Sequence, residues 1–140
     1  MIEDKLILPA TIENWEQVHS FISKYLDLKG CSEKVKFQLL VAAEEIYVNI
    51  AHYAYKDKVD DSVGMATVEL KMPDDIDQTV ITFEDNGIQY DPLKKETPDI
   101  TLTAEQRKIG GLGIHMVRKM MDEVEYKYED GKNILTIKKG

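Results

Sequence analysis

The chain has 140 residues, of which 43% are hydrophobic, and a formal net charge of −8. This composition predicts one globular domain and excludes wholesale disorder. No apolar run approaches the roughly 20 residues of a membrane-spanning helix, and the acidic balance argues against a nucleic-acid backbone as the main partner. The single cysteine, Cys31, cannot form an internal disulfide, and a lone thiol favours a reducing compartment, so we expect a cytoplasmic protein.

The N-terminal part of the chain predicts one strand followed by two helices. Residues 5–9 form a short strand that ends at a proline. Thr11 is a predicted N-cap for a first helix, which Gly30 ends, and Ser32 is predicted to cap a second helix running to about residue 55. The apolar residues that recur at helical spacing in the first helix are Trp15, Val18, Ile22 and Tyr25.

Two strands are predicted next, at residues 63–72 and 79–84, with a turn between them. The segment 88–109 has no strong periodicity, and a connection of that length is typical of a functional lid. Within it, residues 103–106 have the spacing of a capping box, which predicts a short helix.

The C-terminal part predicts a helix that begins at a glycine cluster near residue 110 and runs to about residue 121. Two last strands, at 123–129 and 133–138, flank a hairpin turn. This order of elements is not a strict βαβ alternation. It predicts an α/β two-layer sandwich (α+β), with a mixed, largely antiparallel sheet and helices on one face. We expect a single domain over residues 1–140, with the lid at about 88–110.

Glu45 and Asn49 lie one turn apart on the second predicted helix. At about 100° per residue, both fall on one flank of its apolar stripe, where the wall of a cleft is expected. A carboxylate there can act as a general base, and an amide oxygen is a suitable ligand for Mg²⁺. Either residue alone is equally consistent with a solvated helix flank. The stripe consists of Val35, Leu39, Ala42, Ile46, Ile50 and Tyr53.

The same helix carries a second apolar face, formed by Val41, Val48, Ala51 and Tyr55. This face predicts either another packed helix or a subunit contact, so a homodimer is one of two expectations. The three histidines lack the spacing of zinc ligands, and we interpret them as surface or packing residues. They are His19, His52 and His115.

Two turns contain glycine. Asp85-Asn86-Gly87 follows a predicted strand, where an aspartate can accept a hydrogen bond from an adenine amino group and the glycine lets a ligand approach. Gly110-Gly111-Leu112-Gly113 opens a helix, and helix N-termini of this kind bind phosphates through backbone N–H groups. Taken singly, the first turn is also an ordinary hairpin turn and the second a tight packing turn.

The features occur in the order Glu45-x-x-x-Asn49, Asp85-Asn86-Gly87-x-x-Tyr90-Asp91-Pro92 and Gly110-Gly111-Leu112-Gly113. In this order they resemble the Bergerat-fold (GHKL) ATPases and, within them, the anti-sigma factor serine/threonine kinases of bacteria. The resemblance covers nearly the whole chain. Gln89 stands where the histidine kinases and the gyrase-like enzymes usually have a second glycine, and 140 residues leave no room for a phosphoacceptor helix. These departures favour the serine-kinase branch, although Tyr90 replaces the phenylalanine that is usual there.

The resemblance implies roles for individual residues. Glu45 would be the general base and Asn49 the Mg²⁺ ligand. Asp85 would read the adenine amino group, and Gly87 would let the base approach. Thr136, on the last strand, would support adenine recognition. The residues that would shape the end of the lid and the phosphate-binding start of the helix are Gly110, Gly111, Leu112 and Gly113.

The function implied by the resemblance is that of an ATP- and Mg²⁺-dependent serine/threonine protein kinase in a bacterial partner-switching pathway. Such a kinase phosphorylates an anti-anti-sigma (STAS-type) protein and sequesters a sigma factor in its other state. Two alternatives stay open, because the motifs define a nucleotide site and not the phosphate acceptor. One is a non-enzymatic binding module regulated by ATP, and the other is an ATPase that uses water as acceptor.

Overall fold

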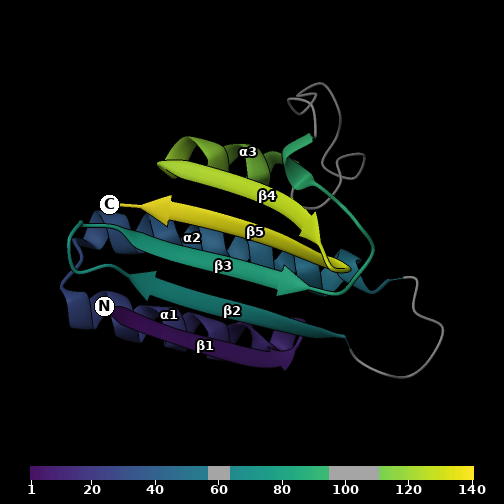
Figure 1. Ribbon diagram of the computed structural model, residues 1–140, viewed down its shortest axis with the longest axis horizontal. Coiled ribbons are helices and arrows are strands. Elements are labelled where there is room, and N and C mark those ends of the chain that lie inside the picture. The colour runs from purple at the N-terminus through teal and green to yellow at the C-terminus, as the bar shows by residue number, and fades with distance from the viewer. Residues whose placement is uncertain (57–63, 95–110) are drawn as a thin grey trace.

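A computed structural model of the chain describes residues 1–56, 64–94 and 111–140. One five-stranded sheet forms the front layer of the molecule, and helices cover its other face (Figure 1). The strands are β1 (Ile2–Pro9), β2 (Met65–Met72), β3 (Thr79–Asp85), β4 (Glu123–Glu129) and β5 (Lys132–Lys139). Their order in the sheet is β1-β2-β3-β5-β4. The two-layer arrangement predicted from the sequence is therefore confirmed.

The sheet is antiparallel in all four of its pairings between described strands, where the sequence predicted a mixed, largely antiparallel sheet. The reason lies in the last hairpin. β5, the second strand of that hairpin, lies beside β3, and β4 takes the edge of the sheet. Because hairpin strands alternate in direction, the insertion of β5 instead of β4 makes every neighbour antiparallel. The hairpin turn has a positive φ at Asp130 (54°) and Gly131 (75°), as a type I′ turn requires.

The helices are α1 (Trp15–Lys29), α2 (Glu33–Asn49) and α3 (Gly111–Met120), with the short helices η1 (Ile12–Asn14), η2 (Ile50–Ala54) and η3 (Pro92–Lys94). The predicted cap of α2 is confirmed, because the Ser32 hydroxyl accepts a hydrogen bond from the Val35 N–H at 3.2 Å. Thr11 instead precedes η1 and makes no side-chain cap. The short helix predicted at 103–106, like most of the predicted lid, lies outside the described residues.

The second helix extends as far as the sequence predicts, but it changes type at Asn49. From Ile50 to Ala54 the chain forms a π-helical turn, η2, which continues α2 without a break. A π-turn widens the helix and is frequent at functional sites. It follows Asn49 directly and leads to Ala54, whose carbonyl accepts a hydrogen bond from Ile88 in the turn after β3.

Alternate residues of the strands face the helices and form the core. The fully buried strand residues on that face include Val68, Leu70, Ile81 and Ile137. They pack against helix residues that include Val18, Ile22, Leu26, Leu39 and Tyr47. Among the described residues, no helix is both long and apolar enough to cross a membrane.

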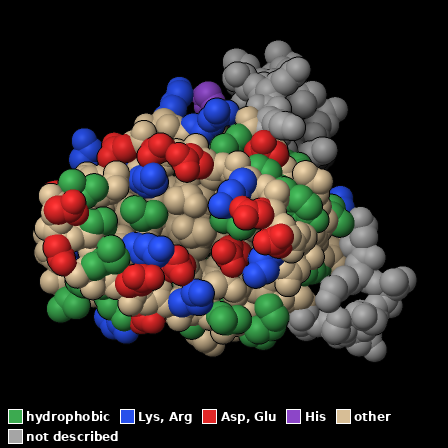
Figure 2. All heavy atoms as spheres, viewed as in Figure 1, with side chains coloured by type: hydrophobic (Ala, Val, Ile, Leu, Met, Phe, Trp, Pro, Cys, Tyr) green, Lys and Arg blue, Asp and Glu red, His purple; other side chains and the backbone are tan. Residues whose placement is uncertain are grey.

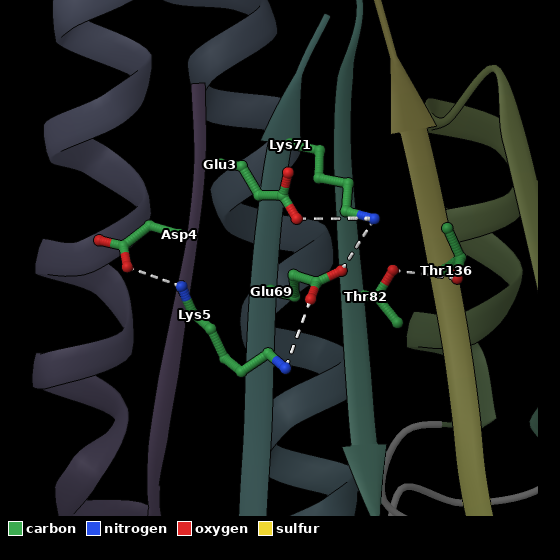
Figure 3. Close-up of polar contacts among 7 residues, drawn as sticks. All are labelled: Glu3, Asp4, Lys5, Glu69, Lys71, Thr82 and Thr136. Atoms are coloured by element: carbon green, nitrogen blue, oxygen red, sulfur yellow. Dashed lines mark hydrogen bonds and ion pairs between the residues drawn. The ribbon is translucent and has the colours of Figure 1, made fainter. Parts of the chain in front are cut away.

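The other face of the sheet is open to solvent and carries mixed charges and scattered apolar side chains (Figure 2). Lys5 Nζ lies 3.7 Å from Glu69 Oε2, so this ion pair joins β1 to β2, whereas Lys71 Nζ and Glu69 Oε1, 3.3 Å apart, both belong to β2 (Figure 3). On the same face, the hydroxyl oxygens of Thr82 and Thr136 are 3.2 Å apart. Exposed pairs of this kind contribute little to stability, and the core lies on the helix side.

Replacement of Tyr47 by phenylalanine is expected to lower the free energy of unfolding by about 1–3 kcal/mol. The buried Tyr47 hydroxyl donates to the carbonyl oxygens of Thr11 (2.7 Å) and Pro9 (3.2 Å), and its loss leaves both without that donor. Urea unfolding of the two proteins measures the difference. Tyr128→Phe is the matched control, because Tyr128 is 41% exposed and should lose almost nothing. An equal effect of both substitutions would contradict the interpretation.

Candidate functional site

A cavity of about 240 Å³ lies between the C-terminal end of α2, the η2 turn, the end of β3 and the β4–β5 hairpin. Its apolar wall includes Ile46, Ile50, Phe83, Ile114 and Leu135. Its polar groups include Asn49, Asp85, Tyr126 and Asn133. Pockets for whole drug-sized ligands measure about 300–1,000 Å³, so this cavity fits a flat ring system better than a complete nucleotide. It brings two of the sequence-predicted residues, Asn49 and Asp85, into one site.

Asp85 is the acidic group in the wall of this cavity. It ends β3 and is only 7% exposed, because its side chain points to the helix side of the sheet. Its Oδ1 accepts hydrogen bonds from the Gly87 N–H and from Asn133 Nδ2, both at 2.9 Å. Its Oδ2 accepts none from the described residues. Burial raises the pKa of the Asp85 carboxyl, and the two bonds to Oδ1 oppose that rise.

The turn after β3 is docked on the end of η2. The Ile88 N–H donates to the Ala54 carbonyl at 2.9 Å. Gly87 lies so close to the same carbonyl that a Cβ atom at this position would collide with it. The sequence predicted that Gly87 leaves room for a ligand, and the structure gives a second reason for glycine, the approach of two backbone segments.

Tyr55 fixes the same turn from its other side. Its hydroxyl accepts a hydrogen bond from the Asn86 N–H at 2.8 Å and donates to the Met65 carbonyl at 2.6 Å. The aromatic ring packs against Gly64, where a Cβ atom would collide with it. Tyr55 therefore links the end of the helical run to β2 and to the turn that positions Asp85. The sequence predicted only that Tyr55 belongs to a second apolar face of the helix, which packs against another helix or a subunit.

Glu45 and Asn49 lie side by side, as their spacing predicts. Asn49 Nδ2 lies 3.4 Å from Glu45 Oε1, which is a long hydrogen bond, and Asn49 lines the cavity. The Glu45 carboxylate contacts Gly113 in the first turn of α3, in the space that a side chain at Gly113 would fill. The Glu45 side chain thus lies at the N-terminal end of α3, where a helix favours negative charge. Gly111 is the first residue of α3, and Gly110 lies outside the described residues.

Thr136 does not occupy the position that the sequence predicted for it. Its side chain lies on the open face of the sheet beside Thr82, whereas the cavity lies on the helix face (Figure 3). Adenine support by Thr136 therefore does not fit the structure. The β5 side chain beside Asp85 is that of Asn133, which sequence reasoning missed. A signal was present, since Asn133 shares the parity of the buried residues Leu135 and Ile137.

The remaining predicted residues are placed without conflict. His19 and His52 are exposed, His115 is partly buried, and none of the three lines the cavity. On the second apolar face of α2, Val41 is 38% exposed, while Val48, Ala51 and Tyr55 are partly buried. Over the described residues, no group of three His, Cys, Asp or Glu side chains converges on a metal position.

Comparison with known proteins finds similar bacterial protein kinases. Serine-protein kinase RsbW of Listeria monocytogenes is 29% identical over 137 residues, which cover 95% of this chain and 84% of RsbW. Serine/threonine-protein kinase BtrW of Bordetella bronchiseptica is 26% identical over 106 residues, which cover 76% of this chain and 71% of BtrW.

A solved structure and a family model extend the comparison. A chain in the crystal structure of the RsbU and RsbW domains of Rv1364c from Mycobacterium tuberculosis superimposes with a TM-score of 0.69 at 16% identity. The match covers 99% of this chain but 32% of that longer chain, and at this identity it establishes the fold alone. Residues 8–139 match the family model described as the histidine kinase-like ATPase domain. The chain therefore belongs to the histidine kinase-like ATPase domain family.

Proposed function

We propose that this chain is an ATP- and Mg²⁺-dependent serine/threonine protein kinase of a bacterial partner-switching pathway. Its acceptor is an anti-anti-sigma (STAS-type) protein, and a sigma factor is its second partner. The observation that best supports a nucleotide site is the hydrogen bonding of the Asp85 carboxylate. Its Oδ1 accepts two hydrogen bonds from the protein, whereas its Oδ2 accepts none from the described residues. The names of RsbW and BtrW as protein kinases support the reaction class.

The cavity suits an adenine ring. Its walls are mostly apolar, and a buried carboxylate oxygen is an acceptor that matches the exocyclic amine of adenine. Guanine presents a carbonyl oxygen at the same position of the ring, and two acceptors facing each other repel. Asn49 and Ile114, which is on α3, line the same cavity as Asp85. With the base at Asp85, the phosphates would therefore extend toward the N-terminus of α3.

The residues present fit a Mg²⁺ ion that is bound chiefly through phosphates. Asn49 Nδ2 is directed to Glu45, so its Oδ1 is the atom that remains for a cation. Mg²⁺ in such sites takes one or two protein ligands and fills its other positions with phosphate oxygens and water. When bound, the ion neutralises charge that develops on the transferred phosphoryl group.

Glu45 is the proposed proton acceptor. In the proposed transfer, a serine or threonine hydroxyl oxygen of the partner forms a bond to the γ-phosphorus. The bond from that phosphorus to the β–γ bridging oxygen breaks, and ADP leaves with its electron pair. The Glu45 carboxylate takes the hydroxyl proton. Asp85 holds the base and the α3 N-terminus holds the phosphates, so most of the rate acceleration comes from positioning.

Binding is the first quantity to test. Calorimetric titration of ATP with excess Mg²⁺ is expected to show about one site per chain, with much weaker binding when a chelator replaces Mg²⁺. Asn49→Ala should weaken Mg²⁺-dependent binding about tenfold or more, because it removes the protein ligand of the ion. Gln17→Ala, which removes an exposed amide of α1, is the control and should bind as the unaltered chain does. Absence of ATP binding to a folded sample would refute the nucleotide site.

Phosphate transfer tests the role of Glu45. Glu45→Gln keeps the size of the side chain, so it should bind ATP within a few-fold of the unaltered chain and transfer phosphate to a STAS-type partner roughly 10²–10⁴ times more slowly. Glu44→Gln, the exposed neighbour on α2, is the matched control. Unchanged transfer by Glu45→Gln would remove the assignment of the base. Intact ATP after long incubation with a bound partner would instead indicate a binding module, and partner-free release of phosphate an ATPase.

A further inference from the structure

Asn133 is a buried amide of the cavity whose hydrogen bonds are all internal. It is 7% exposed and lies on β5, opposite Asp85 in the register of the sheet. Its Nδ2 donates to Asp85 Oδ1 at 2.9 Å and to the Ile88 carbonyl at 2.8 Å. Its Oδ1 accepts from the Tyr126 hydroxyl at 2.5 Å and from the Tyr90 N–H at 3.1 Å. A side-chain amide has two donor hydrogens and two acceptor lone pairs, so these four bonds fill its capacity.

The orientation of this amide is determined by backbone groups. The Tyr90 N–H can only donate, so it requires the oxygen of Asn133, and the Ile88 carbonyl can only accept, so it requires the nitrogen. A flipped amide would face both groups with the wrong atom. Asn133 Nδ2 therefore points at Asp85 Oδ1, and no donor of Asn133 remains for a ligand.

This arrangement determines which oxygen of Asp85 faces the cavity. Two donors, the Gly87 N–H and Asn133 Nδ2, hold Oδ1, and this pair fixes the rotation of the carboxylate. We propose that Asn133, oriented by the Ile88 and Tyr90 backbone groups and held in place by the Tyr126 hydroxyl, is a positioning residue for base recognition, which directs Asp85 Oδ2 toward the exocyclic amine of the bound base. The inference rests on the proposed nucleotide site and adds a residue to it.

Asn133 also connects base recognition to the chain that leaves the site. It binds the carbonyl of Ile88 and the N–H of Tyr90, so both ends of this stretch are fastened to β5 by one side chain. The same stretch begins at the Ile88 N–H, which is bonded to Ala54. Loss of the Asn133 amide would therefore remove hydrogen bonds from Asp85 and from the segment 88–90 at the same time.

The charge of Asp85 depends on the same contact. Burial raises the pKa of Asp85, and the Asn133 bond lowers it, so removal of Asn133 should raise that pKa further. Tyr55 and Tyr126 both interact electrostatically with Asp85, and Asp91 interacts with Tyr126. Burial raises the pKa of both tyrosines, which stay neutral near pH 7. Lys56 also lines the cavity.

The test compares ATP with purine riboside triphosphate, which lacks the exocyclic amine, by calorimetry on the full chain. The unaltered chain should prefer ATP about tenfold or more, because the amine bonds a charged acceptor. In Asn133→Leu this preference should fall to within about threefold, and ATP binding should be lost at a higher pH on acidification. Tyr126→Phe, which keeps the ring and removes only the donor to Asn133, should reduce the preference about threefold.

Thr82→Val is the control, since it removes a polar group from the neighbouring strand on the open face, and it should leave the preference unchanged. If Asn133 has a purely structural role, Asn133→Leu would weaken the binding of both nucleotides equally. If Asn133→Leu keeps the full preference for ATP, this inference is overturned while the proposed function stands. If Asn133→Leu does not fold, Tyr126→Phe decides, and an unchanged preference there overturns it equally. If the unaltered chain binds neither nucleotide, the proposed function and this inference both fail.

Discussion

The hydrogen bond from the Ile88 N–H to the Ala54 carbonyl joins the sheet to the end of the helical run, and the geometry of the site depends on this junction. A single backbone bond contributes only about 1 kcal/mol, but here steric constraints act with it. Gly87 has no side chain at the point of closest approach, and Tyr55 holds Asn86 from the other side. The carboxylate of Asp85 is therefore placed by the contacts of the three residues that follow it. Asn49 belongs to the same helical run, so the junction also sets its distance from Asp85.

Much of this arrangement follows from local rules, which is why the sequence predicted it. The apolar stripe of α2 determines which flank carries Glu45 and Asn49, and Ser32 and Gly30 mark the helix ends through chemistry that acts within a few residues. The turn at Asp85 was recognisable because it ends an alternating strand. Gly113 was recognisable because it belongs to a glycine cluster that opens a helix. Its contact with the Glu45 carboxylate depends on the packing of α3 on α2, so neither segment alone could predict it.

What the sequence did not reveal depends on contacts between distant segments. The π-turn of η2 keeps the apolar pattern of an α-helix, so periodicity cannot distinguish the two. The antiparallel sheet depends on which strand of the last hairpin lies beside β3. Thr136 was assigned to the site by resemblance, whereas strand parity places it on the open face and places Asn133 on the face of Asp85. In this region a two-residue periodicity is a stronger guide than a matching residue type.

Three polar residues that line the cavity differ in how their atoms are used. In Asp85 one oxygen is bound by the protein, and the other accepts no bond from the described residues. In Asn49 the nitrogen is directed to Glu45 and the oxygen remains. In Asn133 every donor and acceptor is already bound. A side chain can bind a ligand only through an atom that the fold has not used, and it can be oriented only through atoms that the fold has used. Asp85 and Asn49 meet both conditions, which suits direct contact with a base and a cation, whereas Asn133 meets only the second. The division of roles between ligand-contacting and positioning residues is thus already set by the hydrogen bonds of the protein itself.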